Sequence, residues 1–153
     1  MCTEHSAVSI KIKRKSGCED LPLPQYVTEG SSGLDLYADV DGQVVLEPGQ
    51  IKLVSAGIYV SIPKGYEAQV RPRSGLALKH GIGIVNSPGT IDSDYRGLVG
   101  IILINLGPAP FVIKRKDRIA QMVIQKVTRA RLDVVEELDE TVRSAGGFGS
   151  SGI

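Results

Sequence analysis

Short apolar runs separated by turn residues dominate this chain, and most of them follow the two-residue repeat of a β-strand. Val8, Ile10 and Ile12 alternate with a serine and two lysines, which predicts a half-buried first strand whose lysines face water. Strongly apolar runs follow at 82–85, 98–104 and 119–124. The rhythm of short β-branched runs and turn residues predicts an all-β barrel or sandwich.

The weaker runs complete this picture. The turn Glu47-Pro48-Gly49-Gln50 predicts a hairpin between residues 44–46 and 51–54, and a separate strand is expected over 57–62. Residues 67–71 form the next strand, which Pro72 ends. Ser74 then stands where the N-cap of a short helix would lie. The two apolar runs at 82–85 and 98–104 predict a β-hairpin whose tip is the polar segment 89–97.

Length and composition narrow the class of protein. The 153 residues suffice for one domain, and a net charge of +1 argues against an extended nucleic-acid surface. The basic cluster 11–15 is therefore interpreted as lysines that protect an exposed edge strand from pairing with other chains. The cluster 114–118 is interpreted as a solvated turn. Cys2 and Cys18 lack metal-ligand spacing, so we expect reduced thiols. Neither a signal peptide nor a membrane span is evident, which favours a cytoplasmic protein, or a nuclear one in a eukaryote, that is not secreted.

Several polar segments carry candidate chemistry. The tip 89–97 holds two carboxylates, a tyrosine and an arginine, although a plain polar turn would look the same. Asp35 lies on the strand face opposite Leu34 and Leu36, either solvated or facing a site. Arg73 next to a helix start suggests an anion site, against the alternative of a capped helix with surface ion pairs. Gln121 interrupts an apolar strand, and its amide is either hydrogen-bonded within the core or in contact with a ligand.

The chain ends in a glycine-rich segment that contains Arg143, Phe148 and several serines. Such a segment is costly to order and is expected to be mobile until a partner or ligand holds it. A frayed terminus is the simple reading. The same residue types can also place backbone N–H groups on phosphate, a ring on a base and a guanidinium on developing charge.

Taken together, five segments in order resemble the motifs of the homotrimeric dUTP pyrophosphatases (dUTPases): 32–38, 71–77, 89–97, 117–122 and 143–152. The resemblance implies a jelly-roll-like distorted β-barrel with one short helix and a flexible glycine-rich arm. It implies a single domain, 1–153, with a core over 1–139 and the arm over 140–153. It also implies a homotrimer in which each active site is assembled from all three chains. Two departures are visible, Ser144 where a glycine commonly follows the arginine, and Ser150-Ser151 where Ser-Thr is commoner.

The resemblance also assigns roles to residues. Asp92 would orient the attacking water, and Tyr95 would pack under the deoxyribose. Uracil would be read by Asn86 and the hairpin backbone at Gly89, Thr90 and Ile91, with Phe148 stacking on the base. Contacts to the phosphates would come from Arg73, Ser74, Gly75, Gln121, Arg143, Gly149, Ser150 and Ser151. Asp35 would lie near a hydrated Mg²⁺ held mainly by the substrate phosphates.

The expected activity is hydrolysis of dUTP to dUMP and pyrophosphate by attack of water on the α-phosphorus. This reaction would keep uracil out of DNA and supply dUMP for dTMP synthesis. Three alternatives remain open from the sequence. They are a dCTP deaminase of the same fold, a catalytically silent dUTP sensor or partner-binding trimer, and a nucleic-acid binder, which the net charge disfavours.

Overall fold

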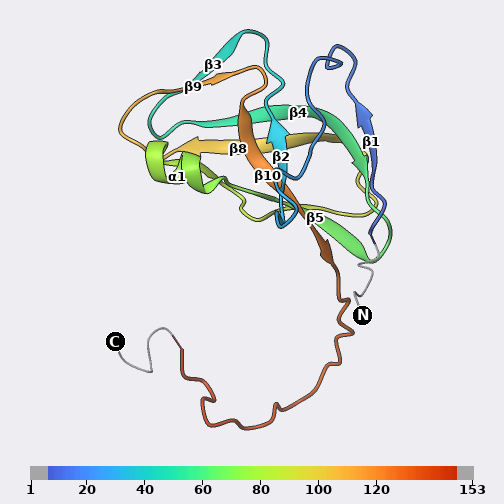
Figure 1. The fold of residues 1–153 in the computed structure, drawn as a ribbon. Coiled ribbons are helices and arrows are strands. Elements are labelled where there is room, and N and C mark those ends of the chain that lie inside the picture. The colour runs from blue at the N-terminus through green and yellow to red at the C-terminus, as the bar shows by residue number, and fades with distance from the viewer. Residues whose placement is uncertain (1–6, 148–153) are drawn as a thin grey trace.

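β-Strands make up all but one of the regular elements in residues 7–147, the part of the chain that the computed structural model describes (Figure 1). Every strand pairing is antiparallel. The exception is the helix α1 (Ser74–His80), which spans seven residues. In this described part, no helix has the length and apolar character needed to cross a membrane.

The strands form three sheets, which are not hydrogen-bonded into one closed barrel. The first runs in the order β1 (Lys11–Arg14), β4 (Ile51–Ser61), β8 (Leu98–Asn105) and β6 (Ile82–Ile84). The second runs β2 (Leu34–Tyr37), β10 (Arg118–Lys126), β5 (Tyr66–Arg71) and β7 (Gly89–Ile91). The third pairs β3 (Gln43–Leu46) with β9 (Phe111–Lys114). The predicted all-β, jelly-roll-like fold with one short helix is confirmed.

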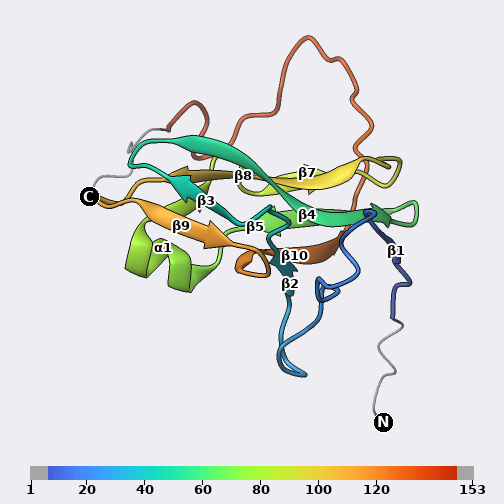
Figure 2. The ribbon, with the colours of Figure 1, turned by 90° about the horizontal axis from the view of Figure 1, so that it is seen from above.

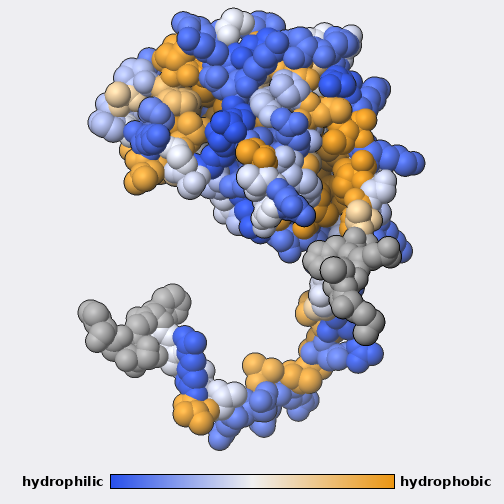
Figure 3. All heavy atoms as spheres, viewed as in Figure 1, coloured by the Kyte–Doolittle hydropathy of each residue, from blue (hydrophilic) through white to orange (hydrophobic). Residues whose placement is uncertain are grey.

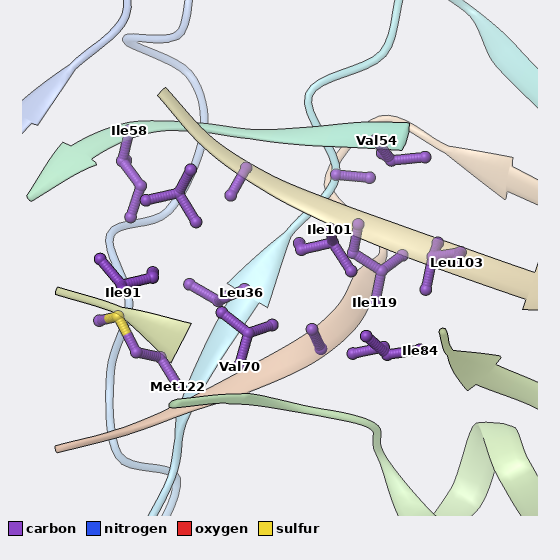
Figure 4. Packing of buried hydrophobic residues seen from close by; sticks show 14 of the residues in the cluster. Leu36, Val54, Ile58, Val70, Ile84, Ile91, Ile101, Leu103, Ile119 and Met122 are labelled. Carbon is purple, nitrogen blue, oxygen red and sulfur yellow. The ribbon is translucent and has the colours of Figure 1, made fainter. Parts of the chain in front are cut away.

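The core lies between the first two sheets, because each strand turns one row of apolar side chains inward. Figure 4 shows Val54, Ile101 and Leu103 of the first sheet facing Leu36, Val70 and Met122 of the second. Leu46 and Ile113 of the third sheet are fully buried in the same cluster. At roughly 25 cal/mol per Å² of apolar area removed from water, this burial is the main favourable contribution to folding.

Two expectations about pairing are wrong. Residues 44–46 and 51–54 do not pair with each other, since β3 pairs with β9 and β4 pairs with β8 and β1. The strand expected over 57–62 is the continuation of β4. Gly57, with φ 66°, lies where the β4–β8 register shifts, and Ala56, Gly57 and Ile58 are all buried there. A bulge of this kind hides the continuity of a strand from the alternation pattern.

Beyond β10 the chain leaves the sheets. The Val127 N–H donates to the Gly65 carbonyl, and residues 128–147 then contain no helix or strand. Figure 2 shows this arm looping away from the strands, and Figure 3 shows apolar side chains along it. Five of its apolar residues are exposed: Leu132, Val134, Val135, Leu138 and Val142.

Candidate active site

One cleft brings together half of the residues that the sequence singled out for phosphate, namely Arg73, Ser74, Gly75 and Gln121. We call it the arginine pocket. It encloses about 390 Å³ and is lined by Val27, Ser31, Ser32, Gly33, Asp35, Arg73, Ser74, Gly75, Arg118 and Gln121. The chain reaches it from β2, from the β5–α1 junction and from the start of β10. Five expected site residues, Asp35, Arg73, Ser74, Gly75 and Gln121, are thus brought together.

Asp35 is the buried centre of this pocket. Its carboxylate pairs with two arginines, through Arg73 Nε to Oδ1 at 3.3 Å and Arg118 Nη1 to Oδ2 at 3.0 Å. Arg73 Nη1 also donates to the Arg118 carbonyl at 2.9 Å. Two guanidinium groups against one carboxylate leave one positive charge in excess, and their planar donors suit phosphate oxygens. Asp35 therefore faces this pocket and is buried between arginines, not solvated.

Arg118 is a site residue that the sequence reasoning missed. Strict alternation along β10 would put residues 118 and 121 on opposite faces of the sheet. The β2–β10 register, however, shifts between Arg118 and Ala120, and Ile119 and Ala120 are both buried. This bulge turns Arg118 and Gln121 to the same side. Arg71, the other arginine beside Pro72, instead donates to Gln69 Oε1 along β5.

Gln121 is held in place from two sides. Its Nε2 donates to the Pro72 carbonyl at 3.0 Å, which uses one of its two N–H groups. A β-carbon at Gly33 would overlap the Gln121 amide oxygen, so glycine at this position makes room for the amide. The amide thus has one protein partner and lines the pocket with its remaining polar groups.

The start of α1 forms one wall of the pocket, but its capping differs from the prediction. Arg73 is the N-cap residue, and Ser74 is the first residue of the helix. The N-cap has no side-chain hydrogen bond, and the Arg73 carbonyl accepts from the N–H groups of Leu76 and Ala77. Ser74 therefore does not cap the helix, and both its side chain and Gly75 are exposed at the pocket.

A second, smaller cavity lies in the segment after β7. We call it the hairpin pocket. It encloses about 240 Å³ and is lined by Thr90, Ile91, Asp92, Tyr95, Val99 and Gly100. Asp92 is exposed at its edge. The two runs that predicted the hairpin do pair, as β6 and β8, but residues 89–91 form strand β7 of the other sheet, so the tip is more structured than expected.

Local hydrogen bonds fix the shape of this tip. Tyr95 N donates to the Asp92 carbonyl at 3.1 Å, and Tyr95 Oη donates to the Leu98 carbonyl at 3.1 Å. Arg96 Nη1 donates to the carbonyls of Ser93 and Tyr95 at 2.8 and 2.7 Å. Asn86 is exposed beside Gly89, where a β-carbon would meet Asn86 Nδ2 at 3.2 Å. The tip therefore has a defined shape in the free chain.

A separate network of charges, which we call the clasp, holds the β9–β10 turn. Arg115 pairs with Asp20 at 2.7 Å and with Asp39 at 2.8 Å, and Lys15 also pairs with Asp39 at 2.7 Å. Lys116 N donates to the Ala38 carbonyl, which ties the turn to the end of β2. The expectation of a merely solvated turn at 114–118 is wrong for Arg115.

The clasp shifts the acid–base behaviour of its members. Burial raises the pKa of the Asp39 carboxyl, but hydrogen bonds from Lys15 and Arg115 outweigh it and lower the pKa to about 2. The hydrogen bond from Arg115 holds the pKa of Asp20 well below its usual range. Burial raises the pKa of the Cys18 thiol, as expected for an unreactive cysteine. Cys2 lies outside the described residues.

The two pockets of one chain lie far apart. In the β5–β7 register Ile91 is opposite Ala68, so Asp92 continues toward Glu67 while Arg73 follows the other end of β5. Six residues of extended chain separate these ends, roughly 20 Å at about 3.4 Å per residue. Arg143 lies on the arm, where its Nε donates to the Gly146 carbonyl. Phe148, Gly149, Ser150 and Ser151 lie outside the described residues.

Other features of the described residues do not form a competing centre. Residues 7–147 contain no group of three His, Cys, Asp or Glu side chains able to hold a metal ion. A cavity of about 530 Å³ is larger than either pocket. It is open, and its charged lining residues are Lys11, Lys64, Asp94, Arg96 and Arg129. Within residues 7–147 its carboxylate, Asp94, is exposed and is not held between two arginines as Asp35 is.

Comparisons with known proteins show the family of this chain. A family model described as dUTPase matches residues 19–152. The chain belongs to the dUTPase family. It is 54% identical over 147 residues to the deoxyuridine 5′-triphosphate nucleotidohydrolase of Caldanaerobacter subterraneus subsp. tengcongensis, covering 96% of this chain and 99% of the relative. The nucleotidohydrolase of Wolbachia sp. subsp. Drosophila simulans is 56% identical over 151 residues, covering 97% and 99%.

Solved dUTPase structures share the fold. The dUTPase of Staphylococcus bacteriophage 80alpha with dUPNHPP superposes with a TM-score of 0.84 at 27% identity, covering 95% of this chain and 99% of that chain. A mutant dUTPase from S. aureus phage phi11, described with a structural Mg(II) ion, has a TM-score of 0.75 at 25% identity, covering 86% and 99%. The chain is therefore an enzyme that hydrolyses dUTP to dUMP.

Proposed function

We propose that this dUTPase releases pyrophosphate by directing water at the α-phosphorus of dUTP from Asp92. An ionised carboxylate only accepts hydrogen bonds, so it can hold a water and take its proton as the P–O bond forms. The exposure of Asp92 at the edge of the hairpin pocket supports this role. The Tyr95 N–H bond to the Asp92 carbonyl holds the backbone of that residue before substrate arrives.

The arginine pocket binds the phosphates in this proposal. Arg73, Ser74, Gly75 and Gln121 contact phosphate oxygens, and Arg118 joins them because it shares Asp35 with Arg73. The positive charge of the pocket offsets the negative charge of the phosphates, which would otherwise repel the nucleophile. Its single carboxylate is neutralised by two arginines, so the pocket remains attractive to anions.

The hairpin pocket binds the base and the sugar. Asn86 and the backbone of Gly89, Thr90 and Ile91 read uracil, and the Tyr95 ring lies against the deoxyribose. Tyr95 is 45% exposed although its hydroxyl donates to the Leu98 carbonyl. An open but anchored ring can serve as a rigid floor for a sugar.

One observation carries the further proposal that each site is shared between chains of a homotrimer. Asp92 and Arg73 lie at opposite ends of β5, roughly 20 Å apart at about 3.4 Å per residue, which is too far for one triphosphate to touch both. This separation supports a site in which a neighbouring copy supplies one of them. In a closed symmetric trimer every chain contributes to two sites. It supplies the hairpin of one site and the arginine pocket of the next.

The arm completes the site from a third chain. Its exposed apolar residues and its lack of regular structure fit a segment that becomes ordered on a neighbour. Arg143 would then reach the phosphates late, as an arginine finger does, with Phe148 on the base and Gly149, Ser150 and Ser151 around the phosphates. Ser144 has φ 42°, in the left-handed region, at the position where this family commonly has glycine. In this scheme the chain is one domain, a core with a mobile arm.

Magnesium fits this site only as an ion carried by the substrate. Both oxygens of Asp35 are already engaged by arginines, so the carboxylate suits contact through a water better than direct coordination. Mg²⁺ keeps several waters and is commonly bound through substrate phosphates, where it neutralises their charge. In the cell, a cytoplasmic enzyme of this kind would keep uracil out of DNA and supply dUMP for dTMP synthesis.

Pyrophosphate release from dUTP, UTP, dTTP and dCTP tests the proposal. We expect rapid release from dUTP alone, because the sugar and base contacts reject the other three nucleotides. Equal release from UTP would contradict the role of Tyr95. Ammonia release from dCTP would instead support the deaminase alternative.

A further inference from the structure

The Tyr95 ring is folded back over the glycine two residues after it. A β-carbon built on Gly97 would lie 2.8 Å from Tyr95 Cε2, and closer still to its Cζ and Oη. Side chains do not approach each other this closely. The ring therefore occupies the space that any side chain at position 97 would need.

The backbone conformation does not explain this glycine. Gly97 is not among the glycines with positive φ, so an alanine could adopt its φ without strain. The ring, in contrast, would have to leave its position to admit a side chain there. In that position its hydroxyl donates to the Leu98 carbonyl at 3.1 Å, and the backbone N–H of Tyr95 donates to the Asp92 carbonyl at 3.1 Å. The missing side chain at position 97 is thus required for the position of the ring.

We infer that Gly97 is a specificity-determining position, which fixes the Tyr95 ring where it separates deoxyribose from ribose. This inference rests on the proposed contact between Tyr95 and the sugar. Discrimination against the 2′-hydroxyl of ribose depends on how closely the ring approaches the sugar. A small displacement of the ring would therefore weaken the selectivity for deoxyribose. Gly97 acts through Tyr95 and contacts no substrate itself, so it is a positioning residue.

The test compares kcat/KM for dUTP and UTP in four variants. Gly97→Ala should lower the ratio of dUTP to UTP by on the order of tenfold, because the methyl displaces the ring. Tyr95→Ala should lower it at least as far. In the double variant Tyr95→Ala/Gly97→Ala no ring remains to be displaced, so the ratio should equal that of Tyr95→Ala alone. Gly83→Ala is the control, because its β-carbon would meet only Ile104 Cγ2, at an ordinary 3.5 Å.

Each result separates the inference from the function on which it rests. An unchanged ratio in Tyr95→Ala would overturn the sugar contact itself. A lowered ratio in Tyr95→Ala with an unchanged ratio in Gly97→Ala would overturn the role of Gly97 alone. An equal effect of Gly97→Ala with and without the ring would also overturn it, because the methyl would then act elsewhere. If Gly97→Ala does not fold, Tyr95→Phe/Gly97→Ala lacks the hydroxyl that overlaps most, and it should give a ratio between those of wild type and Tyr95→Ala.

Discussion

The arginine pocket is held together by side chains from distant parts of the sequence, whereas the polar tip at the edge of the hairpin pocket is held by bonds within a few residues. The Asp35–Arg118 pair spans 83 positions and the Gln121–Pro72 bond spans 49. The bonds of the hairpin tip connect residues one to three positions apart. Local bonds fix the shape of residues 92–98, while the arginine pocket exists only once β2, β10 and α1 have assembled.

Removing the charge of Asp92 should therefore leave the structure of the hairpin tip intact but abolish most turnover. This is the largest effect that we expect. Asp92→Asn should lower kcat by roughly 10²–10⁴-fold, the usual contribution of a positioned general base. Binding of a non-hydrolysed dUTP analogue should be retained, because the main-chain bonds of the tip remain. Asp94→Asn, at an exposed neighbouring position of the same tip, is the matched control and should stay active. Near-normal turnover of Asp92→Asn would remove this residue from its role.

The arginine pocket should respond in the opposite way, with weaker binding and lower stability together. In Asp35→Asn the two arginines lose their shared counter-charge, so we expect KM for dUTP to rise roughly 10- to 100-fold as Arg73 loses its orientation. The thermal midpoint should also fall. Asp133→Asn removes an exposed pair with Arg131 and should change neither. A variant with unchanged KM would show that Asp35 does not orient the arginines.

The clasp differs from both pockets, because its residues line neither of them. We therefore expect its loss to lower stability without a direct effect on the site. Asp39 has a pKa of about 2 in the folded chain against 3.8 for the free group, so its stabilisation is complete above pH 3.8 and disappears as the pH falls toward 2. Asp39→Asn should lower the free energy of unfolding at pH 7 by on the order of 2 kcal/mol. Urea titrations at equal protein concentration should show wild type and variant converging as the pH falls. A constant difference down to pH 2 would contradict this origin.

The smallest effect concerns the turn that the clasp holds. Lys116 has φ 73°, a conformation that costs a non-glycine residue about 1 kcal/mol. Lys116→Gly removes this strain but also an exposed pair with Asp20 at 3.2 Å. Its thermal midpoint should exceed that of Lys116→Ala, which loses the pair and keeps the strain. Equal midpoints for the two variants would show that the left-handed backbone carries no cost here.

The same contrast explains what the sequence could predict. Most strands, the helix after Pro72 and the hairpin with Asp92 and Tyr95 follow from local patterns, and they agree with the structure apart from the helix cap and strand β7. The first strand is a further exception, because β1 begins at Lys11 and not at Val8, and all four of its residues are exposed and not half-buried. The pairing of β3 with β9 joins segments nearly 70 positions apart, for which a local turn gives no warning. Arg118 was missed for a related reason, because the bulge beside it reverses the expected face and the strand pattern contains no sign of a bulge.

Activity of mixed trimers tests the shared site most directly. Asp92→Asn and Arg73→Ala should each be nearly inactive alone, since every site lacks one half. After the two variants are assembled together in equal amounts, about a quarter of the sites should combine an intact hairpin with an intact arginine pocket from a neighbour, and activity should rise to about a quarter of the wild-type level. If differently tagged chains are shown to have mixed while activity stays at the level of the separate variants, both halves of each site must belong to one chain.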